Sequence, residues 1–243
     1  MKIRLLGTGD AIGTPKIGCT CEQCARAHNT GQVRLRTSFL IETRNRTILI
    51  DSSPDLRQQL LACGSPHIDA VIWTHGHYDH FMGFGEFYRV QSMPPVYAPP
   101  PVMEYCGSIF SFLPFRRHVQ EAFRPFRLFG LDFTFLEVSH PPAYTCGLVI
   151  GDGSSRIGYT SDTRHDIPEE SRDHLRDIDL LFADALVPAG YHIPKHMNYP
   201  EACHLASELR AGDFRCVHIS HVMPWSLPHL GMDGECFELG PDE

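Results

Sequence analysis

Metal-binding residue types are most concentrated in one short stretch, His75-Gly76-His77-Tyr78-Asp79-His80. One residue separates His75 from His77, so on an extended backbone both imidazoles leave the same face. Asp79 and His80 point elsewhere once the chain bends, and a single loop can therefore supply ligands to two ions. Imidazole and carboxylate groups suit zinc, manganese or iron. Because so many such groups follow a buried apolar run, the stretch favours a metal site over a solvated histidine-rich loop.

A second cluster contains three thiols, Cys19, Cys21 and Cys24, in a C-x-C-x2-C spacing. These thiols are close enough in the chain to share one ion and are badly placed for disulfides with one another. The chain has nine cysteines, an odd number, so complete intramolecular pairing is impossible. We expect the isolated cysteines elsewhere in the chain to be small buried hydrophobic side chains.

The elements that position these groups are apolar, β-rich runs, several of which end in histidine or aspartate. The runs and their polar ends are 68–74 before His75, 131–138 before His140, 156–160 before Asp162, 177–185 with Asp184, and 214–219 with His218. Ligands gathered at the same ends of several strands are what an enzyme site on an α/β scaffold requires.

Asp51 ends another buried strand, predicted over 47–51, which pairs as a hairpin with the strand 37–42. A carboxylate at such a position needs a partner, and two interpretations stay open. Asp51 can orient a metal-binding histidine through a hydrogen bond, or it can cap the helix predicted over 54–63.

Composition and charge argue against several classes of protein. The chain has 243 residues, of which 42% are hydrophobic, enough for a substantial core, and we expect one domain over residues 1–243. The net charge of −8 argues against a broad basic face for DNA or RNA. The glycine-rich loop 7–14 lacks the spacing of a nucleotide-binding fingerprint. No apolar run is long enough to span a membrane, and no signal-peptide core is visible, so we expect a cytoplasmic protein.

Seven nitrogen- and oxygen-bearing groups can form one centre without any thiolate. They are His75, His77, Asp79, His80, His140, Asp162 and His218. This set is large enough to hold two divalent ions, with one carboxylate as a bridge. Two ions about 3.5 to 4 Å apart can activate a shared hydroxide and neutralise the entering and leaving oxygens when a phosphodiester or another ester is hydrolysed.

The chain resembles hydrolases of the metallo-β-lactamase superfamily, whose H-x-H-x-D-H motif it carries at residues 75–80. The resemblance covers nearly the whole chain and implies an α/β fold, a four-layer αββα sandwich. The segments that carry it outside the motif are 6–9, 48–51, 139–140, 161–163 and 218–221. The implied ligand sets are His75, His77 and His140 for one ion and Asp79, His80 and His218 for the other, with Asp162 as the bridge.

Within the superfamily, the run 19–24 and the segment 231–235 resemble the cyclic phosphodiesterases of the carbon-phosphorus lyase pathway, which open phosphoribosyl 1,2-cyclic phosphate. That resemblance implies a structural zinc ion on three cysteines and a histidine. His28 and His221 are both candidates for the fourth ligand. His221 is preferred because it matches the family position, and because alternation along the last strand turns it away from His218.

His196 lies where related phosphodiesterases carry a histidine that protonates the leaving alkoxide, a task that suits imidazole. His192 is a nearby competitor for this role. Arg164 follows the bridging Asp162, so it can contact a substrate phosphate or form a salt bridge. We expect Asp79 to serve catalysis as well as metal binding.

These features predict a dinuclear phosphodiesterase that hydrolyses small cyclic phosphates, either phosphoribosyl cyclic phosphate or 2′,3′-cyclic nucleotides. Metal-bound hydroxide attacks phosphorus, and His196 is the general acid. The predicted cofactors are two divalent ions, Mn2+ or Zn2+, in the active site and one structural Zn2+ ion. The expected partners are a small phosphate ester and, in a homodimer, a second copy of the chain, with no membrane and no DNA.

Two alternatives belong to the same superfamily. A tRNA 3′-processing endoribonuclease needs a protruding RNA-binding arm, and no long Gly/Lys-rich insertion is visible. An iron-dependent oxidoreductase, or a pyrroloquinoline quinone biosynthesis protein, stays open because iron in a histidine and carboxylate site can activate oxygen. A non-catalytic metal-binding module is the least favoured, since it leaves the acid His196 without a role.

Overall fold

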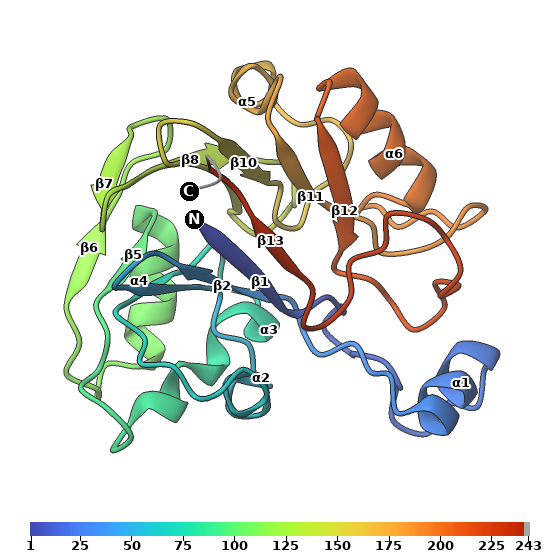
Figure 1. Cartoon of the computed structure of the whole chain (residues 1–243), viewed down its shortest axis with the longest axis horizontal. Helices are drawn as coiled ribbons and strands as arrows, with labels where there is room; N and C mark the ends of the chain where they lie inside the picture. Colours follow the sequence, from blue (N-terminus) through green and yellow to red (C-terminus); the bar gives the residue numbers. More distant parts are fainter. Residues whose placement is uncertain (241–243) are drawn as a thin grey trace.

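Many strands are apolar on both faces, because one face packs on a second sheet and the other packs on helices. In β2 (Ser38–Glu42), Phe39 and Ile41 enter the core between the sheets, whereas Leu40 faces the helices. In β11 (Leu180–Asp184), Leu180 and Phe182 enter the same central core, whereas Leu181 faces the helices of the other half. The computed structural model describes residues 1–240, and its strand alternation produces three cores between four layers (Figure 1).

The first sheet has seven strands in the order β13-β1-β2-β3-β4-β5-β6. Strands β13, β1, β2 and β3 pair antiparallel, and β3 to β6 pair parallel. Besides β2, its strands are β1 (Lys2–Gly7), β3 (Thr47–Ile50), β4 (Ala70–Ile72), β5 (Val96–Ala98), β6 (Arg117–Val119) and β13 (Cys236–Glu238). Its outer face packs on α2 (Leu56–Ala62), α3 (Tyr78–Phe81), the 3-10 helix η1 (Met82–Phe87) and α4 (Pro100–Ile109).

The second sheet has six strands in the order β12-β11-β10-β9-β8-β7. Strands β7 to β10 pair antiparallel, and β10, β11 and β12 pair parallel. Besides β11, its strands are β7 (Phe126–Leu128), β8 (Leu131–Glu137), β9 (Cys146–Gly151), β10 (Arg156–Tyr159) and β12 (Asp213–Val217). Its outer face packs on α5 (Glu169–Leu175) and α6 (Tyr199–Glu208).

The predicted four-layer αββα sandwich is confirmed, as is the predicted hairpin β2–β3, and β9 and β10 form a second hairpin. The strand predicted over 214–219 is shorter than expected and is not the last one, because β12 ends at Val217, His218 has a φ of 57°, and β13 follows. Alternation along β12 therefore does not separate His218 from His221, since neither residue lies in the strand.

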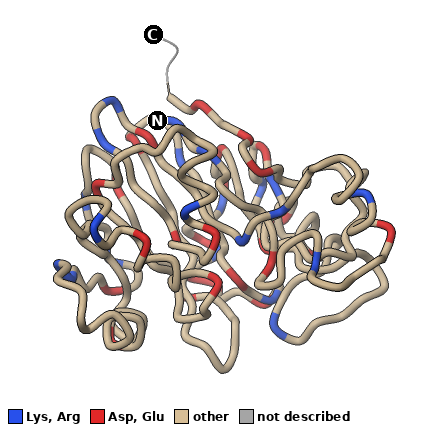
Figure 2. The backbone as a smooth tube through the Cα atoms, turned by 90° about the horizontal axis from the view of Figure 1, so that it is seen from below, with Lys and Arg blue, Asp and Glu red and all other residues tan. Residues whose placement is uncertain are grey.

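One helix lies outside the four layers. This helix, α1 (Glu22–Thr30), projects from one side of the molecule beside the loop that follows β12 (Figure 1). Figure 2 shows acidic and basic residues interspersed along the chain rather than segregated by sign. Within residues 1–240, no helix combines the length and apolar character that crossing a bilayer requires.

Candidate metal centre

The predicted ligands converge because they follow strands that run in one direction. Strands β3 and β4 of the first sheet are parallel, and β10, β11 and β12 of the second sheet are parallel. Three residues at these strand ends have positive φ angles: Asp51 at 55°, Ser161 at 53° and His218 at 57°. Such angles are costly for residues with a β-carbon, and in folded proteins they concentrate at functional sites. The left-handed turns at Ser161 and His218 help to orient two of the predicted ligands, Asp162 and His218, toward the space where the sheet ends meet.

The structure brings all seven predicted ligands together. His75, His77, His140 and Asp162 form one group and Asp79, His80 and His218 form another, with the ligand atoms of each group within 4.8 Å of one another. Asp162 reaches both groups: Oδ2 lies 3.5 Å from Nε2 of His75, and Oδ1 lies 3.4 Å from Nε2 of His80. This position between the groups fits the expected bridge.

Buried atoms of this centre fit a bound cation. Among residues 1–240, Nε2 of His75, Nε2 of His80 and Oδ1 of Asp162 are buried without a hydrogen-bond partner. Native proteins rarely leave such atoms unsatisfied, and metal ions satisfy them. The donor set of imidazole and carboxylate, without thiolate, suits zinc or manganese.

The charges of the centre also fit a cation. Burial lowers the pKa of His75 to about 3, an effect that the neighbouring His80 increases, so His75 is neutral as a metal ligand must be. Burial acts in the same direction on His80, but the nearby carboxylates of Asp162, Asp79 and Asp51 outweigh it and hold the pKa of His80 well above its usual value. The carboxylates thus create a strongly negative field in a buried space.

Asp51 lies beside this centre and is hydrogen-bonded to the metal-binding loop. Its Oδ2 lies 2.7 Å from Nδ1 of His80, and Oδ1 accepts a hydrogen bond of 2.9 Å from the backbone N–H of Thr74. The N-cap position of α2 belongs to Asp55. Of the two interpretations of Asp51, the one in which it orients a metal-binding histidine agrees with the geometry, and the helix-capping one does not.

His196 lies at the edge of the same centre. Its Nδ1 is 2.8 Å from Oδ2 of Asp184, its ring stacks on His218 at 4.9 Å, and it shares a potential ligand group with Asp162 and His218. Burial lowers the pKa of His196, but Asp184 more than offsets this, and the net shift is upward. The competing His192 is exposed in the loop before His196.

Asp184 is a residue whose role the sequence did not reveal. Its Oδ2 also accepts a hydrogen bond from the backbone N–H of Thr163, and its Oδ1 lies 3.7 Å from Nδ1 of His218. The backbone carbonyl of Lys195, 2.9 Å from Nδ1 of His140, was missed as well. The position of Asp184 at the end of a buried strand was a signal in the sequence for its role. The contact with the Lys195 carbonyl could not be predicted, because every residue has a backbone carbonyl.

The three clustered cysteines meet His221. Its Nδ1 lies 3.6, 3.5 and 3.6 Å from Sγ of Cys19, Cys21 and Cys24, respectively. Hydrogen bonds from the backbone N–H of Cys24 and from the His221 imidazole lower the pKa of the Cys21 thiol to about 6. Of the two candidates for the fourth ligand, His221 has this position, and His28 lies exposed in the last turn of α1. Three sulfurs and one imidazole are a donor set typical of structural zinc.

Two hollows open beside the metal centre. One of about 320 Å³ is lined by Gly76, His77, Pro101, Val102, Tyr105, Ala143 and Tyr144. The other, of about 420 Å³, shares Ala143 and Tyr144 and adds His140 and Arg164. Arg164 forms a salt bridge of 2.8 Å with Asp166, and its side chain is 40% exposed. Arg164 thus has the expected salt bridge and also faces the hollow that contains a predicted metal ligand.

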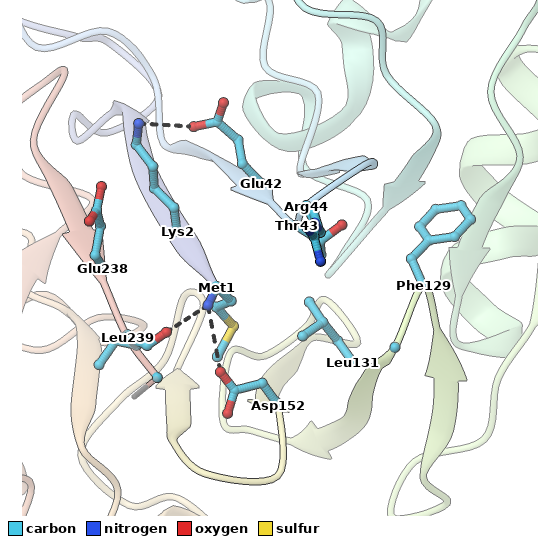
Figure 3. A pocket seen from close by; sticks show the side chains of 12 residues that line it. Met1, Lys2, Glu42, Thr43, Arg44, Phe129, Leu131, Asp152, Glu238 and Leu239 are labelled. Carbon is cyan, nitrogen blue, oxygen red and sulfur yellow. Dashed lines mark hydrogen bonds and ion pairs between the residues drawn. The ribbon is translucent and has the colours of Figure 1, made fainter. Parts of the chain in front are cut away.

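A further hollow of about 550 Å³ lies where strand β1 begins, and residues of β1, β13 and the β2–β3 turn line it (Figure 3). The close-up shows the N-terminal ammonium group of Met1 directed toward the carbonyl of Leu239 and toward Asp152, with Lys2 paired to Glu42. These pairs neutralise charges at the start of β1, whereas the metal centre lies beyond its other end. None of the predicted ligands lines this hollow.

Known proteins resemble this chain over most of its length. A model of the beta-lactamase superfamily domain matches residues 46–219. A solved diphosphatase of the PhnP family is 30% identical, with 98% of each chain covered and a TM-score of 0.86. Zn2+-bound PqqB from Methylobacterium extorquens is 21% identical with a TM-score of 0.85, over 98% of this chain and 100% of that protein, which is a likeness of fold.

Two curated relatives are named for other functions. An octanoyltransferase of Porphyromonas gingivalis is 30% identical over 95% of this chain, but the chain spans only 48% of that protein. Coenzyme PQQ synthesis protein B of Methylobacterium nodulans is 26% identical, over 78% of this chain and 74% of that protein. The octanoyltransferase is thus about twice as long as the region it shares with this chain.

Proposed function

Because this chain belongs to the metallo-β-lactamase superfamily, we propose that it is a metal-dependent phosphodiesterase that hydrolyses small cyclic phosphates. The observation that carries the proposal is the position of His196 beside Asp162 and His218, with its Nδ1 directed to Asp184. A potential proton donor thus lies against a set of metal ligands, as ester hydrolysis requires. The 30% identical diphosphatase supports phosphorus chemistry.

Seven side chains would hold two divalent ions. His75, His77 and His140 would form the first set, Asp79, His80 and His218 the second, and Asp162, which reaches both groups, would bind both ions. When bound, such ions supply Lewis acidity toward a phosphoryl oxygen and lower the pKa of water. We propose Mn2+ or Zn2+ for this centre and Zn2+ for Cys19, Cys21, Cys24 and His221.

The residues around the ions move and hold protons. With Nδ1 of His196 bonded to Asp184, its Nε2 is left to deliver a proton to the leaving alkoxide. Asp184 stabilises the charged imidazole that this task requires, in line with the raised pKa of His196. Asp51 holds the ring of His80 in place through Nδ1, and Arg164 can attract a second anionic group of the substrate.

The direct test is hydrolysis by protein reconstituted with Mn2+ or Zn2+. Bis(4-nitrophenyl) phosphate and 2′,3′-cyclic AMP should both be hydrolysed, and His77→Ala should abolish this activity because it removes a metal ligand. His192→Ala, in the exposed loop, is the matched control and should retain it. Absence of turnover with every phosphodiester under both metals would refute the proposal.

A second candidate is a role in pyrroloquinoline quinone biosynthesis, favoured by the 26% identity to coenzyme PQQ synthesis protein B. Iron in the centre of the purified protein, with oxygen consumption in place of ester hydrolysis, would support this candidate. Retention of tRNA at moderate salt in a gel-shift assay would instead favour an RNA-processing role.

We propose that residues 1–243 form one domain and that the protein acts in the cytoplasm on small phosphate esters. It would act there as a monomer or as a homodimer. Contacts between distant parts of the chain support a single domain. Thr8 donates a hydrogen bond of 2.7 Å to Asp233, and both sheets share the central core.

A further inference from the structure

An exposed aromatic ring lies against the metal-binding loop. Tyr105, in α4, is 55% exposed, although its neighbours Val102 and Cys106 are buried. A β-carbon built on Gly76 would lie 2.6 and 3.0 Å from Cδ1 and Cε1 of the Tyr105 ring. The ring therefore approaches the short segment between the ligands His75 and His77 more closely than any residue but glycine would allow.

The opposite wall of this hollow comes from the second half of the chain. Tyr144 packs against two of the hydrophobic cores and donates a hydrogen bond of 3.1 Å from its hydroxyl group to Glu137. The segment after Tyr144 is hydrogen-bonded to the residue that precedes His75, because the backbone N–H of Cys146 donates to the carbonyl of Thr74 at 3.2 Å. Both walls are thus fixed relative to the metal centre.

The two hollows beside the centre differ in chemistry. The one between Tyr105 and Tyr144 has a mostly apolar lining, with Pro101, Val102 and Ala143, and its volume of about 320 Å³ is typical of small-molecule sites. The other hollow contains Arg164. His77 lines the apolar hollow and His140 lines the other, and Nδ1 of His77 lies 3.2 Å from Nε2 of His140. A molecule that reacts at the metal centre can therefore place an apolar group in the first hollow and an anionic group near Arg164 in the second.

We propose that the hollow between Tyr105 and Tyr144 binds a planar ring of the substrate, a nucleobase, and so selects nucleoside cyclic phosphates over sugar cyclic phosphates without a base. This inference rests on the proposed phosphodiesterase function. The exposed ring of Tyr105 supplies an aromatic surface on which any nucleobase can stack. Stacking on one aromatic side chain strengthens binding roughly 10- to 100-fold.

The first experiment compares kcat/KM for 2′,3′-cyclic AMP with that for glycerol 1,2-cyclic phosphate, which has the same reactive ring and no base. Tyr105→Ala should lower the value for the nucleotide roughly 10- to 100-fold and leave the glycerol ester unchanged. Tyr105→Phe should retain both activities because it keeps the ring. Tyr88→Ala is the matched control, since Tyr88 is 51% exposed and does not line the hollow. An equal loss with both esters would show a structural role for Tyr105 and overturn the inference.

A binding experiment separates this inference from the proposed function. Calorimetry on metal-loaded wild-type protein should show adenosine 5′-monophosphate binding at least 10-fold more tightly than ribose 5-phosphate, with the difference lost in Tyr105→Ala. Equal affinity for the two ligands would overturn the ring site, whatever the enzyme hydrolyses. A Tyr105-dependent preference in a protein that cleaves no phosphodiester would support the ring site and refute the hydrolytic function alone.

Discussion

At the scale of single residues, Asp184 connects two histidines of the centre without belonging to the predicted ligand set. Its carboxylate faces Nδ1 of His196 at 2.8 Å and Nδ1 of His218 at 3.7 Å. A carboxylate in this position fixes the tautomer of each ring, and it favours the protonated form of His196. Asp184 is therefore a positioning residue that acts through His196 and His218.

Replacement of Asp184 tests this role. Asp184→Asn should lower kcat roughly 10- to 100-fold with little change in metal content, because an amide keeps the shape but loses the charge that stabilises protonated His196. The pH at which His196 loses its proton should also fall, so the basic limb of the kcat profile should move to lower pH. Metal analysis and pH–rate profiles are the measurements, and Asp173→Asn on the exposed side of α5 is the control. An unchanged pH profile would contradict the role.

At the scale of elements, the sequence predicted the long strands well and the short edge strands poorly. Strand β8 is recognisable because apolar and polar residues alternate along it, and β11 is recognisable as a buried apolar run. Strands β6, β7 and β13 have three residues each and are partly exposed, so they have no distinct pattern. The sequence also grouped all seven ligands by strand ends and family motif, but the left-handed turn at His218 depends on tertiary packing and was not foreseen.

The contact between Gly76 and Tyr105 links two elements that are distant in sequence, and it gives a prediction about stability. Gly76→Ala should lower the free energy of unfolding by about 1–3 kcal/mol, because the added methyl group overlaps the Tyr105 ring. Adding Tyr105→Ala should restore much of this loss, so the two changes should not be additive. Denaturant unfolding of both single variants and the double variant measures the coupling. Additive effects would mean that the ring does not lie against Gly76.

At the scale of the whole molecule, the thiol cluster ties the N-terminal part of the chain to its C-terminal part. Cys19, Cys21 and Cys24 precede the second strand of the first sheet, and His221 follows the last strand of the second. A zinc ion on these four groups would join both halves of the sandwich. Since His218 is three residues from His221, loss of the ion would also loosen one ligand of the metal centre.

The pH dependence of this zinc site follows from its thiols, which must lose their protons to bind the ion. The pKa of Cys21 is lowered to about 6, whereas burial raises the pKa of the neighbouring Cys24 to about 11, so protons and zinc compete for the cluster. One equivalent of zinc should be retained at pH 7 and released as the pH is lowered. A chromogenic chelator measures the release, and His28→Ala should leave the release curve unchanged. Release at the same pH from His221→Ala would show that His221 is not a ligand.

The wide spacing of the ligands along the chain has a consequence for synthesis on the ribosome. The three thiols are made about 200 residues before His221, and the first histidines of the other centre are made well before His218. Because His218 and His221 are only three residues apart, both centres become complete almost together, once His221 has been made. Until then the nascent chain presents unpaired thiols and imidazoles to the cell, and the supply of the correct metal matters most in that interval.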